Sequence, residues 1–211
     1  MTIKTFTFNP FQENTYIVHD ETNEAVIIDA GCLNKDEKSA IINYLEEKKL
    51  TLKRVINTHL HLDHQFGNKF IFDTFGIKPE ANIEDEYLVE SFVTQARSFG
   101  LSVSEEAQAI GNYIVENQEI KFGNTIMTTL LVPGHSPGSV AFYSEKEGVV
   151  FVGDVLFRGS IGRTDLPRGD FATLILSITK KLFLLPDSTV VYSGHGPTTT
   201  IGYEKKNNPY L

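Results

Sequence analysis

The sequence predicts an α+β fold in which two β-sheets pack face to face and helices cover their outer sides. Strand-like runs followed by helical periodicity fill the first half, and the same succession returns in the second half. Each sheet built in this way has one apolar face to bury, and stacking the two faces against each other buries both.

The first half is predicted to begin with strands and to continue with helices. β-Branched and aromatic residues dominate the strand-like runs, which polar residues or glycine separate. Ile41, Ile42 and Leu45 recur at helical spacing, and Gly76 is expected to end a later helix. The predicted strands are 3–8, 14–20, 24–31 and 52–58, and the predicted helices are 35–50, 66–75 and 83–98.

The second half is predicted to return to strands and to close with one more helix and strand. Its strand-like runs are YIVENQEIKFG, TIMTTLLVPG and VAFYSEKEGVVFVGD, and a last one, STVVYSGHG, follows an apolar helical segment. The predicted strands are 113–123, 125–134, 140–154 and 188–196, and the predicted helix is 171–184.

Composition sets limits on the class of protein. With 211 residues, 41% of them hydrophobic, and no linker, residues 1–211 are predicted to form one domain. The single cysteine, Cys32, excludes an internal disulfide and suits a reducing compartment. The start, MTIKTFTFNPF, is unlike a signal peptide, and no run reaches the ~20 apolar residues of a membrane span. A cytoplasmic protein without membrane contact is therefore predicted.

Charge argues against nucleic acid as a partner. The chain has 19 basic and 27 acidic residues, a net charge of −8, and a broad basic face is not expected. The sequence leaves the oligomeric state open.

Five of the six histidines lie where predicted strands end. VINTH ends at His59, MTTLLVPGH at His135 and TVVYSGH at His195, while VVFVGD ends in the same way at Asp154. Side chains at the ends of adjacent strands converge, so these residues are predicted to share one pocket.

The stretch THLHLDH supplies several candidate ligands at once. In extended backbone His59, His61 and Asp63 would share a face, and a turn into a helix near Asp63 would bring His64 beside them. Histidine nitrogen and carboxylate oxygen suit zinc, and also iron or manganese. One short segment could therefore serve two adjacent metal ions.

These motifs resemble the metallo-β-lactamase superfamily of di-metal hydrolases. THLHLDH, PGHSPGS, GDVLF and SGHG occur in the family's order, and VIIDAG, with Asp29 and Gly31, matches its early strand and turn. The resemblance implies an αββα four-layer sandwich. It also implies two metal sites, one formed by His59, His61 and His135 and the other by Asp63, His64 and His195, with Asp154 bridging them.

Within the superfamily the sequence is most similar to the hydroxyacylglutathione hydrolase (glyoxalase II) branch, in its small single-domain bacterial form. GSIGRTDLPRGD and the ending GHGPTTTIGYEKKNNPYL carry this similarity. Longer members continue into a helical domain that binds glutathione, and this chain, which stops at Leu211, is expected to lack it. Asp154 stands where many true β-lactamases have cysteine, so antibiotic hydrolysis is not expected.

The resemblance implies hydrolysis of a thioester such as S-lactoylglutathione. Two divalent ions, zinc by preference and iron or manganese otherwise, would make hydroxide available near neutral pH. This hydroxide would attack the thioester carbonyl, and Asp63 would orient it and accept its proton. The metals would form a locally positive floor in an acidic protein, which should attract a small anionic acyl thioester.

Two arginines after Asp154 are candidates for substrate binding. Arg158 and Arg163 lie in a glycine-rich segment and could pair with a substrate carboxylate, since arginine makes bidentate contacts. The alternative is a surface loop held by Asp165 and Asp170. Asp29 is expected to support the ligands rather than to bind metal.

Two other activities of the same fold compete with thioester hydrolysis. A persulfide dioxygenase shares the GRTD stretch and would need one iron, here on His59, His135 and Asp154. An RNA-processing nuclease is the other, and the acidic balance argues against it. The ending SGHGPTTT favours the hydrolase.

Overall fold

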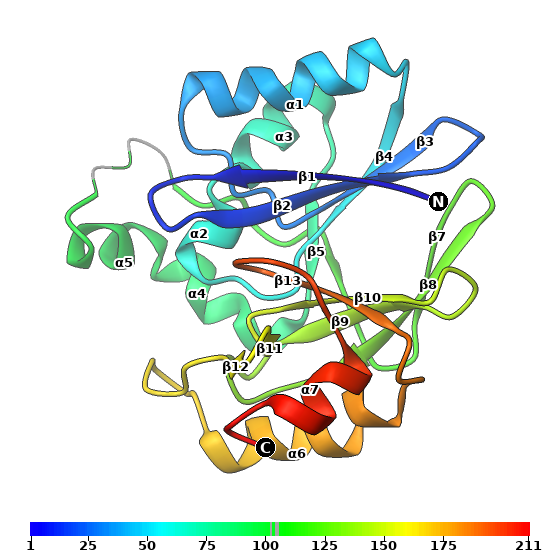
Figure 1. The fold of residues 1–211 in the computed structure, drawn as a ribbon. Coiled ribbons are helices and arrows are strands. Elements are labelled where there is room, and N and C mark those ends of the chain that lie inside the picture. Colours follow the sequence, from blue (N-terminus) through cyan, green and yellow to red (C-terminus); the bar gives the residue numbers. More distant parts are fainter. Residues whose placement is uncertain (102, 104–105) are drawn as a thin grey trace.

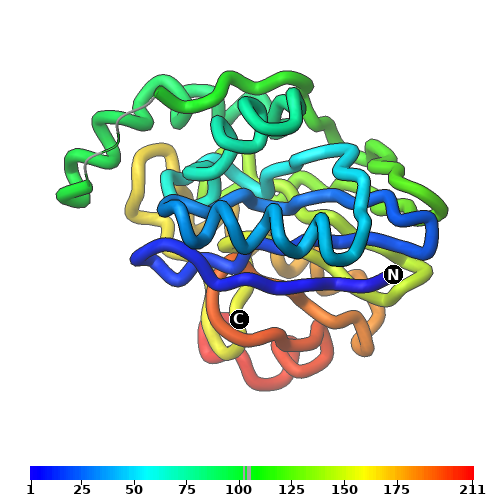
Figure 2. The backbone as a smooth tube through the Cα atoms, turned by 90° about the horizontal axis from the view of Figure 1, so that it is seen from above, coloured from blue at the N-terminus to red at the C-terminus, as the bar shows by residue number. Residues whose placement is uncertain are grey.

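Two six-stranded sheets stack against each other in the computed structural model of the chain, which describes residues 1–101, 103 and 106–211. Helices α1 (Lys35–Glu47) and α3 (Asn68–Phe75) cover the first sheet, and α6 (Phe171–Lys180) and α7 (Ile201–Asn207) cover the second (Figure 1). Seen from above, α1 lies over the first sheet and α5 (Phe92–Ser98) projects at one end (Figure 2). The predicted αββα sandwich is confirmed.

The first sheet is mixed. Its strands β1 to β3 pair antiparallel, and β3 to β6 pair parallel. Helix α1 forms the crossover from β3 to β4, as a parallel pair requires. In spatial order the strands are β1 (Thr2–Phe8), β2 (Glu13–His19), β3 (Glu24–Ile28), β4 (Thr51–Ile56), β5 (Pro79–Ala81) and β6 (Asn112–Tyr113).

The second sheet is antiparallel except for the pair of β10 and β13. Strands β11 (Leu156–Phe157) and β12 (Ser160–Ile161) form a small hairpin beside it. In spatial order the six strands are β14 (Thr199–Thr200), β13 (Val190–Ser193), β10 (Val149–Gly153), β9 (Val140–Ser144), β8 (Thr125–Leu131) and β7 (Glu119–Phe122).

Three apolar cores separate the four layers. Between the sheets, Val18 and Ile56 of the first pack with Phe142 and Phe151 of the second. Outside them, Ile41 and Leu45 of α1 cover the first sheet, and Leu174 and Ile178 of α6 cover the second. Both sheets are therefore apolar on two faces, which explains their nearly continuous hydrophobic strands.

Several helix boundaries differ from the predictions. The helix expected over 66–75 begins earlier, as α2 (Leu62–Gln65), and restarts as α3 after Gly67. A side chain at Gly67 would collide with Ala30 and Cys32, so the chain passes close to the first sheet there. The helix expected over 171–184 ends at Lys180, and a 3₁₀ turn, η2 (Leu182–Leu184), follows.

The predicted helix 83–98 is three short pieces: η1 (Ile83–Asp85), α4 (Glu86–Glu90) and α5. The break falls at Ser91, whose hydroxyl donates to the Tyr87 carbonyl at 2.7 Å and so competes with regular helix geometry. The predicted strand 140–154 is the hairpin of β9 and β10. Helix α7 was not predicted, although Thr200 caps its first turn.

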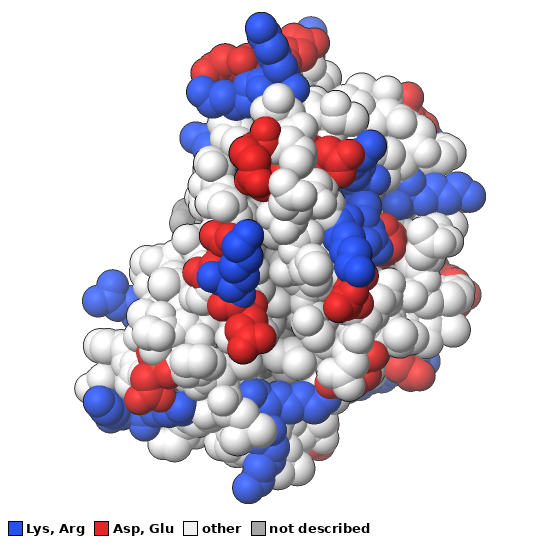
Figure 3. All heavy atoms as spheres, turned by 90° about the vertical axis from the view of Figure 1, so that its right-hand side faces the viewer, with Lys and Arg blue, Asp and Glu red and all other residues white. Residues whose placement is uncertain are grey.

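The molecular surface opposite α5 carries basic and acidic side chains intermixed (Figure 3). No helix within the described ranges is both long enough and apolar enough to cross a membrane.

Candidate metal centre

The predicted ligands meet at one edge of the sandwich because their strands end there. Strands β8, β10 and β13 run in the same direction, since β9 is antiparallel to β8 and to β10, and β13 is parallel to β10. Two main-chain hydrogen bonds join the sheets at this edge, Val140 N to Thr58 O and Asn14 N to Gly194 O, each 2.7 Å long. The end of β4 is thereby held beside the ends of the second sheet.

The first group of candidate ligands contains only imidazoles. His59 and His61 follow β4, and His135 follows β8; all three are buried. His61 Nδ1 lies 2.8 Å from His135 Nε2, and the His59 ring centroid is 4.8 Å from that of each of the other two. One nitrogen from each ring lies within 4.8 Å of the others, so the group can hold one metal ion.

The second group is Asp63, His64 and His195. His195 Nε2 is 3.2 Å from Asp63 Oδ2, and His64 Nε2 is 3.8 Å from the same oxygen. The backbone is extended at His61 and turns into α2 at Leu62, which carries Asp63 away from the imidazole group and beside His64. The predicted turn into a helix near Asp63 is confirmed, but because it begins at Leu62, Asp63 does not share a face with His59 and His61.

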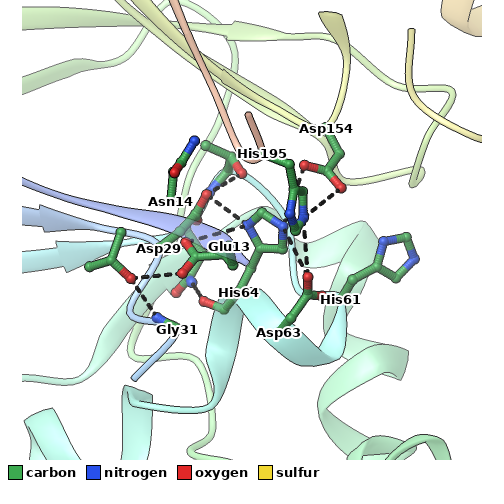
Figure 4. A network of polar contacts seen from close by, with 12 residues as sticks. Glu13, Asn14, Asp29, Gly31, His61, Asp63, His64, Asp154 and His195 are labelled. Atoms are coloured by element: carbon green, nitrogen blue, oxygen red, sulfur yellow. Dashed lines mark hydrogen bonds and ion pairs between the residues drawn. The ribbon is translucent and has the colours of Figure 1, made fainter. Parts of the chain in front are cut away.

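Asp154 lies between the two groups. Its Oδ1 is 3.4 Å from His64 Nε2, while its Oδ2 is 3.7 Å from His135 Nε2 and 3.4 Å from His195 Nε2. In Figure 4, Asp63, Asp154 and His195 point toward one another beside His64, and His61 lies beyond Asp63. One carboxylate thus reaches both groups, as a bridging ligand must.

Unsatisfied buried atoms indicate that these residues fit metal ions. Among the described residues, His59 Nε2, His64 Nε2 and Asp154 Oδ1 are buried and lack a hydrogen-bond partner. Such orphan atoms are rare in native proteins because each costs free energy. A cation placed among them would satisfy all three, and nitrogen with carboxylate oxygen suits zinc, iron or manganese.

The other ring nitrogen of four histidines is already engaged, which fixes the rings. His59 Nδ1 is 3.1 Å from the Thr58 hydroxyl, and His64 Nδ1 is 3.0 Å from Asp29 Oδ2. The Nδ1–H groups of His135 and His195 donate to the carbonyls of Arg163 and Gln12, at 2.8 and 3.2 Å. In each ring Nε2 remains for a metal, an arrangement typical of metal-binding histidine.

Asp29 supports this arrangement in the way the sequence suggested. It could form a third cluster with His59 and His64. Its Oδ1 accepts from Thr58 N and its Oδ2 from Thr58 Oγ1, both at 2.7 Å, and Oδ2 also faces His64. Because both oxygens are engaged, Asp29 orients the two histidines rather than competing for the ion.

The two groups differ in their electrostatics. Burial, with the neighbouring histidines, lowers the pKa of His61 to about 3 and the pKa of His59 well below its usual value. Burial alone would also lower the pKa of His195, but hydrogen bonds with Asp154 and Asp63 raise it to about 10. His59 and His61 therefore offer neutral nitrogen, whereas in the second group the ionised carboxylates of Asp63 and Asp154 keep His195 protonated until a cation displaces that proton.

Two buried acids at the site were not predicted. Asp85 is fully buried and accepts from Leu60 N at 3.1 Å, Ser136 Oγ at 2.8 Å and Gly138 N at 2.7 Å, which ties the turn of His59 and His61 to the loop of His135. Asp85 thus stands in an acidic run of the sequence, yet its carboxylate is buried rather than solvated. Glu13 is also buried, 4.0 Å from His64 Nδ1.

The candidate substrate-binding arginines line two different pockets, and His195 lines both of them. Arg163 lines the cavity above the ligands and makes a bidentate pair with Asp165, both contacts at 2.7 Å. Arg158 lines a separate shallow pocket with His195, and its guanidinium lies 5.6 Å from the Tyr203 ring centroid. Asp170 pairs with neither arginine and instead caps α6 by accepting from Thr173 N.

Fold and ligand arrangement define a class of protein. Residues 8–195 match the family model of the metallo-β-lactamase superfamily, so the chain belongs to this superfamily. The predicted membership is confirmed, and the chain is a metallo-hydrolase of that superfamily.

Individual relatives cover the whole chain. Hydroxyacylglutathione hydrolase GloC from Haemophilus influenzae is 39% identical over 212 residues, covering 100% of this chain and 98% of that protein. The crystal structure of BLEG-1, a B3 metallo-β-lactamase, has a TM-score of 0.87 and 36% identity, covering 100% of this chain and 99% of its own. TTHA1623 in a di-iron-bound form also has a TM-score of 0.87 and 36% identity, covering 99% and 100%.

Proposed function

We propose that the chain hydrolyses thioesters of the hydroxyacylglutathione type, with S-lactoylglutathione as the first candidate substrate. The observation that carries this proposal is the pair of ligand groups sharing Asp154 at the floor of an open cavity of about 610 Å³. The cavity volume lies within the range of small-molecule sites. The similarity to GloC over the full chain supports this choice of substrate.

The ligand residues form two groups, one for each of two cations. His59, His61 and His135 would hold one ion, Asp63, His64 and His195 the other, and Asp154 would lie between them. A bound pair of divalent ions lowers the pKa of a coordinated water from 15.7 toward about 7 and polarises a carbonyl oxygen. Zinc is the proposed metal, and the di-iron form of TTHA1623 makes iron the main alternative.

Asp63 is the proposed catalytic residue. Its carboxylate lines the cavity and lies 3.2 Å from His195, where it can orient water and accept its proton. Water oxygen adds to the thioester carbonyl carbon, the carbon–sulfur bond breaks, and the thiolate takes up a proton. The products are a carboxylate, a thiol and one released proton.

Elemental analysis combined with a substrate panel tests this proposal. We expect about two cations per chain and turnover of S-lactoylglutathione. Asp63→Asn should lower kcat/KM by about 10²- to 10⁴-fold, whereas Asp73→Asn, the same change at an exposed position of α3, should not. A β-lactam and a persulfide with oxygen uptake complete the panel. One iron per chain together with oxygen uptake would show a persulfide dioxygenase instead of a thioester hydrolase. Turnover of the β-lactam alone would show a β-lactamase.

A further inference from the structure

The cavity above the ligand groups has an apolar wall. His61, Asp63, His135, Asp154 and His195 line its floor. Its sides come from the turn after β1, from α2 and α4, from the end of α5 and from the loop after β12. The apolar side chains that these segments contribute are Phe11, Leu62, Leu88, Phe99, Leu166 and Pro167.

Contacts between the segments of the wall hold its side chains in place. The Tyr87 hydroxyl donates to the Pro167 carbonyl at 3.0 Å, which joins α4 to the loop after β12. The rings of Phe11 and Phe99 meet edge to face, with centroids 5.4 Å apart. Phe99 is nevertheless 51% exposed, so a large apolar side chain at the cavity remains open to solvent.

Positive charge is scarce on this wall. Arg163 is the one basic side chain among the cavity-lining residues that the structure describes, and Asp165 already pairs with its guanidinium. Arg168 lies 4.0 Å from the Tyr87 ring centroid. The remaining polar side chains of the wall are neutral: Tyr87, Ser91, Gln95 and Ser98. Among the cavity-lining residues that the structure describes, a carboxylate on the acyl chain would therefore meet no lysine or arginine other than the paired Arg163.

We propose that this cavity binds the acyl chain of the thioester and that the chain is apolar, either aliphatic or aromatic. This inference rests on the proposed thioester hydrolysis and revises the expected anionic acyl group. Any negative charge of the substrate then belongs to its thiol part, outside the apolar wall. The acyl chain gains binding free energy because it leaves water and contacts the side chains of Phe11, Leu88 and Phe99.

A series of acyl thioesters of one neutral thiol, N-acetylcysteamine, tests the proposal with the metal-loaded protein. We expect kcat/KM to rise about fourfold for each methylene buried, from acetyl through butanoyl to hexanoyl. Succinyl has the same chain length as butanoyl but ends in a carboxylate, and it should react more slowly. A flat series, or a faster succinyl thioester, would overturn the inference.

Two cavity variants and one control variant test whether the acyl chain binds at this wall. Phe99→Ser should lower the hexanoyl-to-acetyl ratio of kcat/KM by about tenfold. Phe171→Ser, at an equally exposed phenylalanine (55%) on α6, should keep the wild-type ratio. Leu166→Arg should raise the succinyl-to-butanoyl ratio by about tenfold, a gain that misfolding cannot imitate. Unchanged ratios in both cavity variants would overturn the inference.

Binding of inert analogues separates this inference from the proposed function. Ketones with a methylene in place of the thioester sulfur cannot be hydrolysed, and calorimetry measures their affinity directly. If no thioester is turned over but affinity rises with chain length and falls in Phe99→Ser, the proposed reaction is wrong and the apolar acyl site stands. If affinity is independent of chain length, or is higher for the succinyl analogue, the apolar acyl site is wrong. This conclusion holds whether or not thioesters are turned over.

Discussion

At the scale of single residues, the site is built from histidines whose second nitrogen is already engaged. Asp29, Thr58 and two main-chain carbonyls hold four rings in place, so each Nε2 is positioned before any ion arrives. The candidate ligands could be predicted because histidine is scarce in this chain and gathers at strand ends. Asp85 and Glu13 could not, because nothing in an acidic sequence distinguishes a buried carboxylate from a solvated one.

Asp85 is expected to support both stability and metal binding. Asp85→Asn keeps one acceptor oxygen but leaves donors from Leu60, Ser136 and Gly138 competing for it, and a buried unpaired donor costs about 1–3 kcal/mol. Urea unfolding should show a loss of that size, together with weaker metal binding. Glu86→Gln, one residue further on and exposed, is the control. Equal stability of the two variants would refute this role of Asp85.

Metal uptake is expected to release protons. Since the pKa of His195 is raised to about 10 without metal, the ring is protonated near pH 7.5 and must lose that proton to bind an ion. Calorimetric titration with zinc, in buffers of different ionisation enthalpy, should show this release, and it should decline as the pH approaches 10. His195→Asn should release one proton fewer, whereas His19→Gln should match the wild type. No buffer dependence would contradict the expectation.

At the scale of elements, the sequence located strands better than helices. Apolar strands buried on both faces stand out as hydrophobic runs, and most were predicted. Helix breaks depend on close contacts that a sequence does not display, such as Gly67 against Ala30 and Ser91 bonding back to Tyr87. The turn into α2 at Leu62 has the greatest effect on the site, because it separates Asp63 from His59 and His61.

Gly194, just after β13, shows how closely the backbone must pass the ligands. A methyl group there would collide with Asp154 Oδ1 and come within 2.6 Å of His64 Cε1. Gly194→Ala should therefore displace both side chains and lower metal content to about one ion per chain or less. Gly148→Ala is the control: its φ of +64° strains any side chain, but a methyl group there meets open space and no metal ligand, so metal content should stay complete. Full metal content in Gly194→Ala would show that metal binding does not depend on the positions that Asp154 and His64 have in the structure.

At the scale of the whole molecule, the centre joins two halves of the chain. The first sheet and the helices after it provide His59, His61, Asp63 and His64, and the second sheet provides His135, Asp154 and His195. Burial between the sheets holds the sandwich together, and the ligands sit at one edge of that interface. The overall architecture could be predicted because both sheets need a buried face, whereas the apolar cavity wall, assembled from separate short helices and loops, could not.

Ions that bridge the two sheets should stabilise the fold as a whole. A ligand present at 100 times its Kd adds about 2.7 kcal/mol to the free energy of unfolding. Removing the metal with a chelator should therefore lower Tm by several degrees in thermal unfolding, and adding zinc back should restore it. His61→Ala should show a smaller response than the wild type because one ligand group is incomplete. A Tm that is independent of chelator and zinc would contradict a bridging centre.

The most direct measurement is anomalous X-ray diffraction from crystals grown with a single kind of divalent cation. Two peaks are predicted, one among His59, His61 and His135 and one among Asp63, His64 and His195, with Asp154 touching both. A single peak away from Asp154, or none at this edge of the sandwich, would contradict the account.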